Sequence, residues 1–243
     1  MSTEPEFDQF AKDYEDVLDR ATQIGGEESG YFASYKVDIV HDRIGGDGQD
    51  LRILDFGCGV GQSIPYLAGR FPKAEILGTD VSSQSIAVAE ARHGPLAHFT
   101  PYEDGDPLPY ADASVDVAFT ACVFHHIPQA EHAAVLAEVR RVLKPGGTFF
   151  VFEHNPLNPL TMKVVNDCPF DENAVLIRAP ELRRRLEHAG FEEVRARFCL
   201  FVPGQLRWLR PLESVLTWCP AGAQYYVQGR RGASSTTSQL QSV

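Results

Sequence analysis

A glycine-rich turn is the part of the chain best suited to binding a ligand. Asp55 is followed by Gly57, Gly59 and Gly61 at alternate positions, directly after a short apolar run. Glycines let a ligand approach the backbone closely, because no Cβ stands in the way. In a sheet of parallel strands such a turn lies beyond the carboxyl ends of the strands, where ligands bind. A dinucleotide fingerprint would need a further glycine where Gln62 stands, so the spacing disfavours a nicotinamide enzyme.

A second acidic residue, Asp80, ends the next apolar segment. It lies about 20 residues past the glycines, the separation at which an acidic residue reaches a ribose. One carboxylate can accept hydrogen bonds from both ribose hydroxyls. For Asp80 taken alone, a turn or helix-capping role is the alternative, and the glycine motif favours the ribose.

Three histidines follow later apolar runs and could act as general bases, because the pKa of histidine lies near neutrality. They are His125, His126 and His154. Neighbouring side chains of an extended segment point in opposite directions, so we expect one of the pair to face a substrate, with His125 ahead of His126. Glu153 could orient His154. A purely structural role in fixing a loop is the alternative for each histidine.

These residues sit among alternating strands and helices, which indicates an α/β fold. Helices of about 10–15 residues between strands are typical of βαβ units and a mainly parallel sheet. The predicted strands are 51–56, 74–79, 97–100, 115–121, 148–152, 193–202 and 224–227. The predicted helices are 62–70, 82–93 with Ser82 as N-cap, 135–143 before Pro145, 180–188, and one within 206–218.

The segment 1–48 precedes the first predicted strand and carries aromatic residues at helical spacing, which predicts a helical lid over the cleft. We expect one domain over 1–231, with a core at 49–153 and substrate-side insertions at 154–231. A Ser- and Thr-rich tail, 232–243, is expected to be flexible. The aromatic residues of the lid are Phe7, Phe10, Tyr14, Tyr31 and Tyr35.

Four stretches, in this order, resemble the class I S-adenosylmethionine-dependent methyltransferases, in particular the bacterial small-molecule enzymes of methyltransferase type 11. The resemblance covers about 51–153 and implies a doubly wound, Rossmann-like sheet of seven strands, mainly parallel, whose last strand is antiparallel. The stretches are Asp55 to Gly61, Leu77 to Asp80, Asp104-Gly105, and Arg141-Val142-Leu143-Lys144-Pro145-Gly146-Gly147.

The resemblance also implies S-adenosylmethionine as the cofactor. Its methionine end is a zwitterion without phosphate, so Asp55 is the candidate partner of the ammonium, and Asp104 and Gly105 are placed against the adenine. Methyl transfer needs no metal in principle, and no metal-ligand spacing is present. The expected cofactor-binding residues are Tyr14, Asp55, Gly57, Cys58, Gly59, Gly61, Asp80, Val81, Asp104, Gly105 and Ala121.

Composition excludes several other classes. The 243 residues include 22 basic and 33 acidic ones, a net charge of −11, which argues against a nucleic-acid or anionic-membrane binder. Five scattered cysteines without a CxxC pair indicate reduced thiols and a cytoplasmic protein. The polar N-terminus predicts no signal peptide, and no apolar run is long enough to span a membrane.

The predicted function is methyl transfer to a small molecule, with a hydroxyl oxygen of a sugar, glycolipid or polyketide-like metabolite as first choice. The apolar segment 206–218 could face an apolar or lipid-linked acceptor, and packing on the sheet is the alternative. Transfer to nitrogen or carbon, a nicotinamide or nucleotide-sugar Rossmann enzyme, and a non-catalytic cofactor-binding scaffold stay open. The oligomeric state stays open as well.

Overall fold

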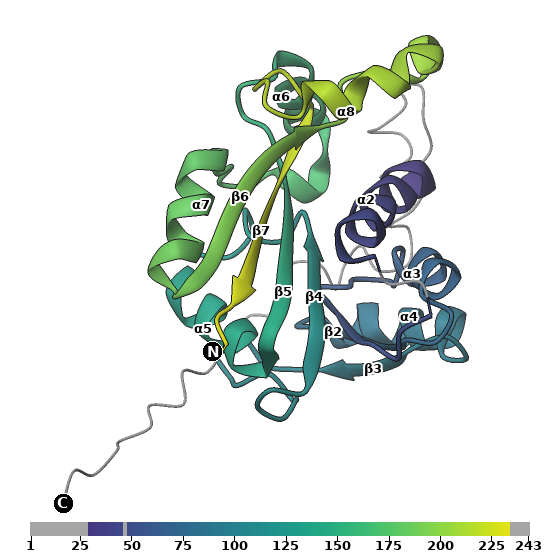
Figure 1. Cartoon of the computed structure of the whole chain (residues 1–243), viewed down its shortest axis with the longest axis vertical. Helices are drawn as coiled ribbons and strands as arrows, with labels where there is room; N and C mark the ends of the chain where they lie inside the picture. Colours follow the sequence, from purple (N-terminus) through teal and green to yellow (C-terminus); the bar gives the residue numbers. More distant parts are fainter. Residues whose placement is uncertain (1–28, 46–47, 234–243) are drawn as a thin grey trace, which may run out of the picture.

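The computed structural model describes residues 29–45 and 48–233, which form one seven-stranded sheet with helices on both faces (Figure 1). The strand order is β3-β2-β1-β4-β5-β7-β6, and only β7 runs antiparallel to its neighbours. The strands are β1 (Arg52–Phe56), β2 (Glu75–Asp80), β3 (His98–Pro101), β4 (Val115–Ala121), β5 (Leu143–His154), β6 (Phe191–Cys199) and β7 (Gln224–Arg231). This confirms the predicted doubly wound, mainly parallel sheet.

Two hydrophobic clusters cover the two faces of the sheet, because successive side chains of a strand point to opposite sides. On β5, Phe149 and Val151 join the cluster under α5 and α7, whereas Phe150 and Phe152 join the one under α2 and α3. The helices are α2 (Ser29–Ile44), α3 (Ile64–Arg70), α4 (Ser83–His93), α5 (His132–Val142), α6 (Pro159–Asp167), α7 (Ala179–His188) and α8 (Glu213–Leu216).

The carboxyl ends of the parallel strands face one end of the molecule, where the later insertions gather. Helix α6, the 3-10 helices η3 (Pro169–Asp171) and η4 (Gly204–Leu212), and α8 belong to these insertions. Figure 1 shows α6 and α8 at the upper ends of the strands, and α2 lower, to the right of the upper part of β4. No helix among the described residues is both long and apolar enough to cross a bilayer.

Several predicted elements are confirmed with close bounds. The strand 115–121 coincides with β4. Ser82 caps α4, because its side chain accepts a hydrogen bond from the Ser85 backbone N–H at 3.0 Å. Strand β5 begins at Leu143 rather than 148, since Leu143 pairs with Val115 across a register shift, and β7 continues to Arg231 rather than ending at 227.

The segment predicted to be helical, 206–218, is helical over 206–216, but it is not one continuous α-helix. The chain forms the 3-10 helix η4 and then the single turn α8. Pro211 cannot donate a backbone hydrogen bond, and Leu206 has the non-helical dihedrals φ −113° and ψ 23°. Both features oppose a continuous α-helix.

Part of the predicted lid lies outside the described residues, namely Phe7, Phe10 and Tyr14 with the rest of 1–28. Most of the predicted tail does too, at 234–243. The described part of the lid is α2, which is helical as predicted. The division of the chain into lid, core and insertions stays a prediction.

Candidate active site

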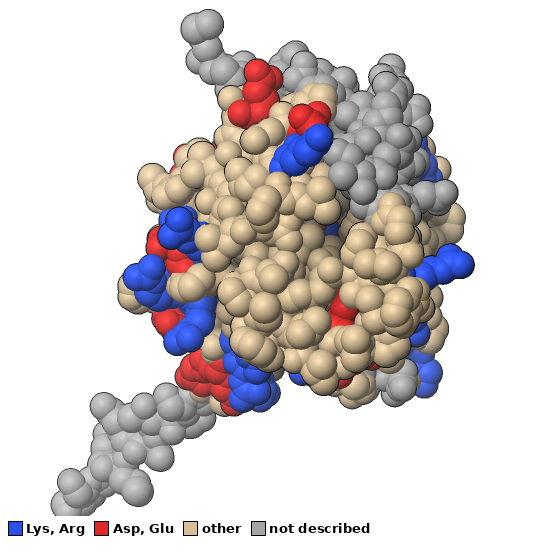
Figure 2. Space-filling model, turned by 90° about the horizontal axis from the view of Figure 1, so that it is seen from above, with Lys and Arg blue, Asp and Glu red and all other residues tan. Residues whose placement is uncertain are grey.

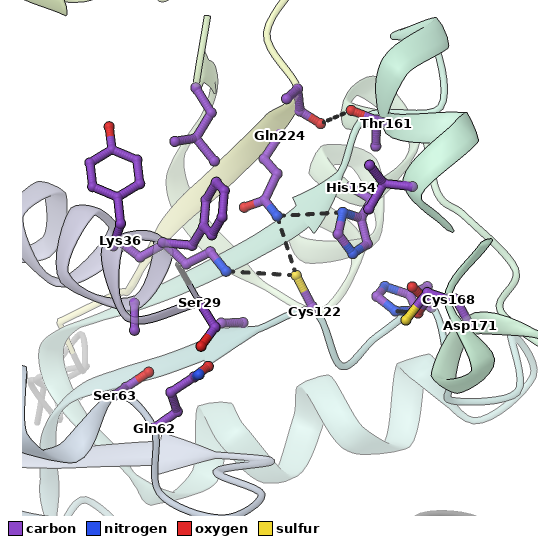
Figure 3. Close-up of a pocket in the computed structure, with 18 of the residues that line it drawn as sticks. Ser29, Lys36, Gln62, Ser63, Cys122, His154, Thr161, Cys168, Asp171 and Gln224 are labelled. Carbon is purple, nitrogen blue, oxygen red and sulfur yellow. Dashed lines mark hydrogen bonds and ion pairs between the residues drawn. The ribbon is translucent and has the colours of Figure 1, made fainter. Parts of the chain in front are cut away.

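One pocket joins the glycine turn to the histidines at the carboxyl ends of the strands. Its walls come from α2, the turn after β1, the ends of β4 and β5, helix α6 and the start of β7. Figure 3 shows Lys36 of α2, Ser63 beside α3, and His154 and Gln224 of the sheet around the same space. A single space therefore contains part of the expected cofactor-binding residues together with the three candidate histidines.

The glycine turn needs glycine for conformation and for space. Gly57 has φ +70° and Gly59 has φ +52°, values that favour glycine. A Cβ on Gly57 would lie 2.5 Å from Cγ2 of Val123, whereas a Cβ on Gly59 would meet nothing within 4 Å. The turn is fixed to β2, because the backbone N–H groups of Gly57 and Cys58 both donate to the Thr79 carbonyl, at 2.8 and 3.0 Å. Gly57 thus secures the packing, and Gly59 leaves open space for a ligand.

Asp55 is a buried carboxyl group facing this pocket. It is only 3% exposed, and within the described chain its side chain accepts no hydrogen bond. Burial raises the pKa of Asp55 to about 8, the Asp80 charge adds to this, and Lys36 partly opposes it. A buried carboxyl group without a hydrogen-bond donor fits a cationic ligand group, so the site fits the ammonium of S-adenosylmethionine.

Asp80 connects two turns of the site. Its Oδ2 accepts a hydrogen bond from the Gly59 backbone N–H, and its Oδ1 accepts one from the Ser82 backbone N–H, both at 2.9 Å. The side chain does not line the pocket described above. The turn role considered for Asp80 is therefore present in the structure, and the ribose role stays a prediction.

His125 lies between two carboxylates inside the protein. Its Nδ1 is 2.5 Å from Glu153 Oε2 and its Nε2 is 3.2 Å from Asp171 Oδ1. Burial lowers the pKa of His125, but Glu153 and Asp171 outweigh it and hold the pKa well above its usual value. The expectation that Glu153 orients His154 is wrong: adjacent residues of β5 point to opposite faces, so Glu153 orients His125 instead.

His126 lies in a turn rather than in an extended segment, so the expected alternation of the pair is also wrong. The two imidazole rings have centroids 4.2 Å apart, both side chains line the pocket, and both approach Asp171. His126 Nε2 is 3.5 Å from Asp171 Oδ1. Burial and the neighbouring His125 charge lower the pKa of His126 to about 4.

His154 belongs to a third group of polar side chains, together with Cys122, Gln224 and Lys36 (Figure 3). Residues His154 and Gln224 are directly paired between β5 and β7, and Gln224 Nε2 lies 3.4 Å from His154 Nδ1. Gln224 Nε2 also donates to Cys122 Sγ at 3.7 Å, and Lys36 Nζ donates to the same sulfur at 3.8 Å. Burial raises the pKa of Cys122, but His154 and Lys36 together outweigh it and lower the pKa to about 7.

The structure brings together most, but not all, of the expected site residues. Those that line the pocket are Asp55, Gly57, Cys58, Gly59, Ala121, His125, His126 and His154. Gly61, Asp80, Val81, Asp104 and Gly105 do not line it, and Tyr14 lies outside the described residues. The residues missed by sequence reasoning are Lys36, Cys122, Cys168, Asp171 and Gln224. No motif marks them. Cys122 directly follows β4 and Gln224 begins β7, whereas Lys36 lies on α2 and Cys168 and Asp171 follow α6.

Comparison with known proteins identifies the class that this fold and site define. A family model described as a methyltransferase domain matches residues 53–147. An uncharacterized methyltransferase of Synechocystis sp. is 30% identical over 160 residues, which cover 64% of this chain and 73% of the relative. The chain belongs to the class I S-adenosylmethionine-dependent methyltransferases, and S-adenosylmethionine is the cofactor of that family.

Other relatives share the same part of the chain. The O-methyltransferase cnsE of Penicillium expansum is 30% identical over 162 residues, covering 60% of this chain and 54% of the relative. The fatty-acid O-methyltransferase of Mycolicibacterium smegmatis is 31% identical over 130 residues, covering 53% of this chain and 47% of the relative. The chain thus spans about half the length of these two curated relatives.

A solved structure shows the same fold over nearly the whole chain. It is a methyltransferase from Thermotoga maritima, described as a possible histamine N-methyltransferase. The TM-score is 0.65 at 20% identity, and the match covers 93% of this chain and 97% of the other. At this identity the likeness shows the fold alone.

Proposed function

We propose that the protein transfers the methyl group of S-adenosylmethionine to a hydroxyl oxygen of a small, largely apolar molecule. The observation that carries the proposal is the single pocket that holds Asp55 and the glycine turn beside the histidine cluster. When bound, the cofactor supplies a methyl group on a positively charged sulfur. The protein has to hold the acceptor in line with that group and receive one proton.

The residues around the glycine turn support the proposed binding of the cofactor. Asp55 would bind the ammonium of the methionine part, and the open backbone at Gly59 would lie against the cofactor. A carboxylate offers about four acceptor positions, so Asp80 would bind the ribose in addition to its two backbone partners. Asp104 and Gly105, both exposed, would border the adenine.

His126 is our candidate for the group that receives the proton. Both ring nitrogens of His125 already lie within hydrogen-bond distance of carboxylates, those of Glu153 and Asp171. The side chain of His126 is 13% exposed, whereas that of His125 is fully buried. His126 is therefore the member of the pair that an acceptor hydroxyl can reach.

Gln224 would position the acceptor through a hydroxyl group other than the one that reacts. Its Oε1 is buried and has no hydrogen-bond partner in the described structure, while its Nε2 is engaged by Cys122 and His154. A buried oxygen without a donor is costly, by about 1–3 kcal/mol, unless a ligand supplies one. A second hydroxyl group of the acceptor would supply such a donor, because the reacting hydroxyl gives its only proton to His126.

The acceptor half of the pocket and its surroundings favour an apolar molecule. Large apolar side chains line the pocket, among them Phe32, Leu160, Val164, Leu200 and Phe201. The end of the molecule above the strands carries few charges in its described part, and charged residues gather mainly at one margin (Figure 2). Exposed apolar residues there are Leu157, Leu160, Leu206, Trp208, Leu212, Val215 and Trp218.

The names of two relatives support this choice. Two of the relatives described above are named as O-methyltransferases, and one of them acts on fatty acids by its name. A glycolipid or polyketide-like acceptor combines the apolar body and the hydroxyl that the pocket calls for. A sugar without an apolar part would leave the apolar lining in contact with water.

Transfer of a labelled methyl group from S-adenosylmethionine to three matched acceptors tests the proposal. Octyl glucoside carries both hydroxyls and an apolar chain, glucose lacks the chain, and octylamine replaces the hydroxyls by an amine. We expect methylated product from octyl glucoside well above that from glucose or octylamine. If only octylamine is methylated, the proposal is wrong and the protein is an N-methyltransferase. If glucose gives as much product as octyl glucoside, the acceptor does not need an apolar part.

A further inference from the structure

Three potential metal ligands meet at one wall of the pocket. The donor atoms of His125, His154 and Asp171 all lie within 4.8 Å of one another, and His125 Nε2 is 3.2 Å from Asp171 Oδ1. Donor atoms about 2.1 Å from a tetrahedral zinc ion lie roughly 3.4 Å apart. One pair of donors already has about the separation that an ion requires. The other separations are at most 4.8 Å, so they would have to shorten by up to about 1.4 Å.

Glu153 holds the first of these ligands in the orientation that metal sites use. A metal-bound histidine almost always donates its other ring N–H to a carboxylate, a carbonyl or water. Here Nδ1 of His125 is held by Glu153 Oε2 at 2.5 Å, and both side chains are fully buried. Glu153 is fixed in turn, because its Oε1 accepts the Phe124 backbone N–H at 2.8 Å. The Nε2 atom of His125 is therefore directed toward Asp171 by a rigid support.

The charge of the cluster also fits a divalent cation. In the part of the chain that the structure describes, neither Glu153 nor Asp171 forms an ion pair with a lysine or an arginine. Their partners are His125 and, for Asp171, also His126. Two carboxylates carry two negative charges, which one divalent ion balances without protonated imidazoles.

We propose that His125, His154 and Asp171 bind one divalent transition-metal ion, with Glu153 positioning His125. Two imidazoles and one carboxylate suit Zn²⁺, Fe²⁺ or Co²⁺ better than Mg²⁺ or Ca²⁺, which prefer oxygen ligands. The three residues come from the loop after β4, the end of β5 and η3, so no sequence spacing announces the site.

His125, His154 and Asp171 line the same pocket as Asp55 and the glycine turn, so an ion held by them would be within this pocket. An acceptor hydroxyl bound to the ion would lose its proton more readily, because the cation stabilises the resulting oxygen anion. This use of the ion rests on the proposed function, whereas the binding of the ion does not.

Titration of the full-length, chelator-treated protein with Co²⁺ tests the site without any turnover. We expect one equivalent of Co²⁺ to bind, with a visible d–d absorption stronger than that of hydrated Co²⁺. Asp171→Asn should weaken binding by about 100-fold or more, because removing a ligand costs at least as much as removing its support. Glu153→Gln should weaken it by about 10- to 100-fold. Glu172→Gln, the same change of charge on an exposed neighbour, should leave the affinity unchanged.

Several outcomes overturn the proposal. They are the absence of saturable binding, an unchanged affinity in folded Asp171→Asn, and a strong thiolate-to-cobalt band that would assign the ion to Cys122 or Cys168. Circular dichroism establishes folding, and His154→Gln takes the place of Asp171→Asn if that variant does not fold. Full methyl transfer without metal binding would remove the site and keep the proposed function. Stoichiometric metal binding without methyl transfer to any acceptor would keep the metal site and remove the proposed function.

Discussion

The backbone N–H of Gly59 donates a hydrogen bond to Asp80 Oδ2 at 2.9 Å and so ties the turn after β1 to the end of β2. The two motifs that the sequence places about 20 residues apart are thus one physical unit. Any ligand that contacts the glycine turn depends on this bond for the position of the backbone. Asp80 therefore influences the cofactor subsite even though its side chain does not line the pocket.

Replacing Asp80 should weaken cofactor binding. Asp80→Ala removes the acceptor of two backbone hydrogen bonds and the proposed ribose contact, which should cost about 1–3 kcal/mol of binding free energy. Isothermal calorimetry with S-adenosylmethionine measures the change. Glu103→Ala, an exposed acidic residue in a neighbouring turn, serves as control and should bind normally. Unchanged affinity in a folded Asp80→Ala protein would remove Asp80 from the cofactor site.

Binding of the cofactor should release a proton from Asp55. The pKa of this carboxyl group is about 8, so at pH 7 the group is mostly protonated in the free protein. An ammonium placed beside it favours the charged form, so binding should release about one proton and should strengthen as the pH rises toward 8. Calorimetry in two buffers with different ionisation enthalpies counts the protons. Asp55→Asn should release none, and an equal release from that variant would refute the assignment.

The same group should make the free protein less stable as the pH rises. The folded-state pKa of about 8 lies above the ordinary aspartate value of about 3.9, so the folded state binds more protons between those limits. The free energy of unfolding therefore falls across the window from about pH 4 to pH 8. Asp80 and Lys36 face Asp55 and are unchanged in Asp55→Asn, so urea unfolding of both proteins at several pH values isolates the Asp55 contribution. Equal pH slopes would contradict the prediction.

Replacing His126 should mainly lower turnover, whereas replacing His125 should mainly lower the stability of the protein. His126→Ala should lower turnover by roughly 10²–10⁴-fold and keep the affinity for the cofactor, because it removes the proton acceptor. His125→Ala should instead destabilise the protein by about 3–5 kcal/mol, since it leaves buried Glu153 without its partner. Labelled methyl transfer and urea unfolding of both variants separate the two effects. Near-normal turnover in both folded variants would mean that the two histidines have only a structural role.

Gly57 and Gly69 offer a matched test of the glycine turn. Gly57→Ala should destabilise the protein by about 1–3 kcal/mol, because φ is +70° and the new Cβ would meet Val123. Gly69 lies in α3, where an added Cβ would meet nothing within 4 Å, so Gly69→Ala should stabilise by about 0.5–1 kcal/mol. Thermal unfolding of both variants measures the difference. Similar stability of the two would mean that the turn tolerates a side chain.

The sequence predicted those parts of the molecule that local chemistry specifies. A strongly apolar run predicts β4 within its observed bounds, and Ser82 predicts the start of α4. The motif from Asp55 to Gly59 is correctly placed in the pocket because ligand access and backbone conformation both demand glycine there. These features depend on a few consecutive residues, so they can be recognised without knowledge of the fold.

The acceptor side depends on contacts between distant segments and could not be predicted in the same way. Glu153 meets His125 from 28 positions away, and Asp171 from 46 positions. Lys36 reaches Cys122 from a helix that precedes the sheet. Apolar spacing assigns residues to a face of an element, and it carries no information on which loop ends meet.

Asn155, directly after β5, joins the two long insertions that wall the acceptor side. Its side-chain nitrogen donates to the carbonyls of Pro220 and Gly222, at 2.9 and 2.7 Å, and only 1% of the residue is exposed. These two hydrogen bonds hold the insertion after β5 and the insertion before β7 together close to the sheet. The glycine turn and Asp55 belong to another part of the chain. A change at the base of one insertion would therefore also shift the other. Grafting both insertions as a unit is accordingly the natural route to redesigning what the enzyme methylates.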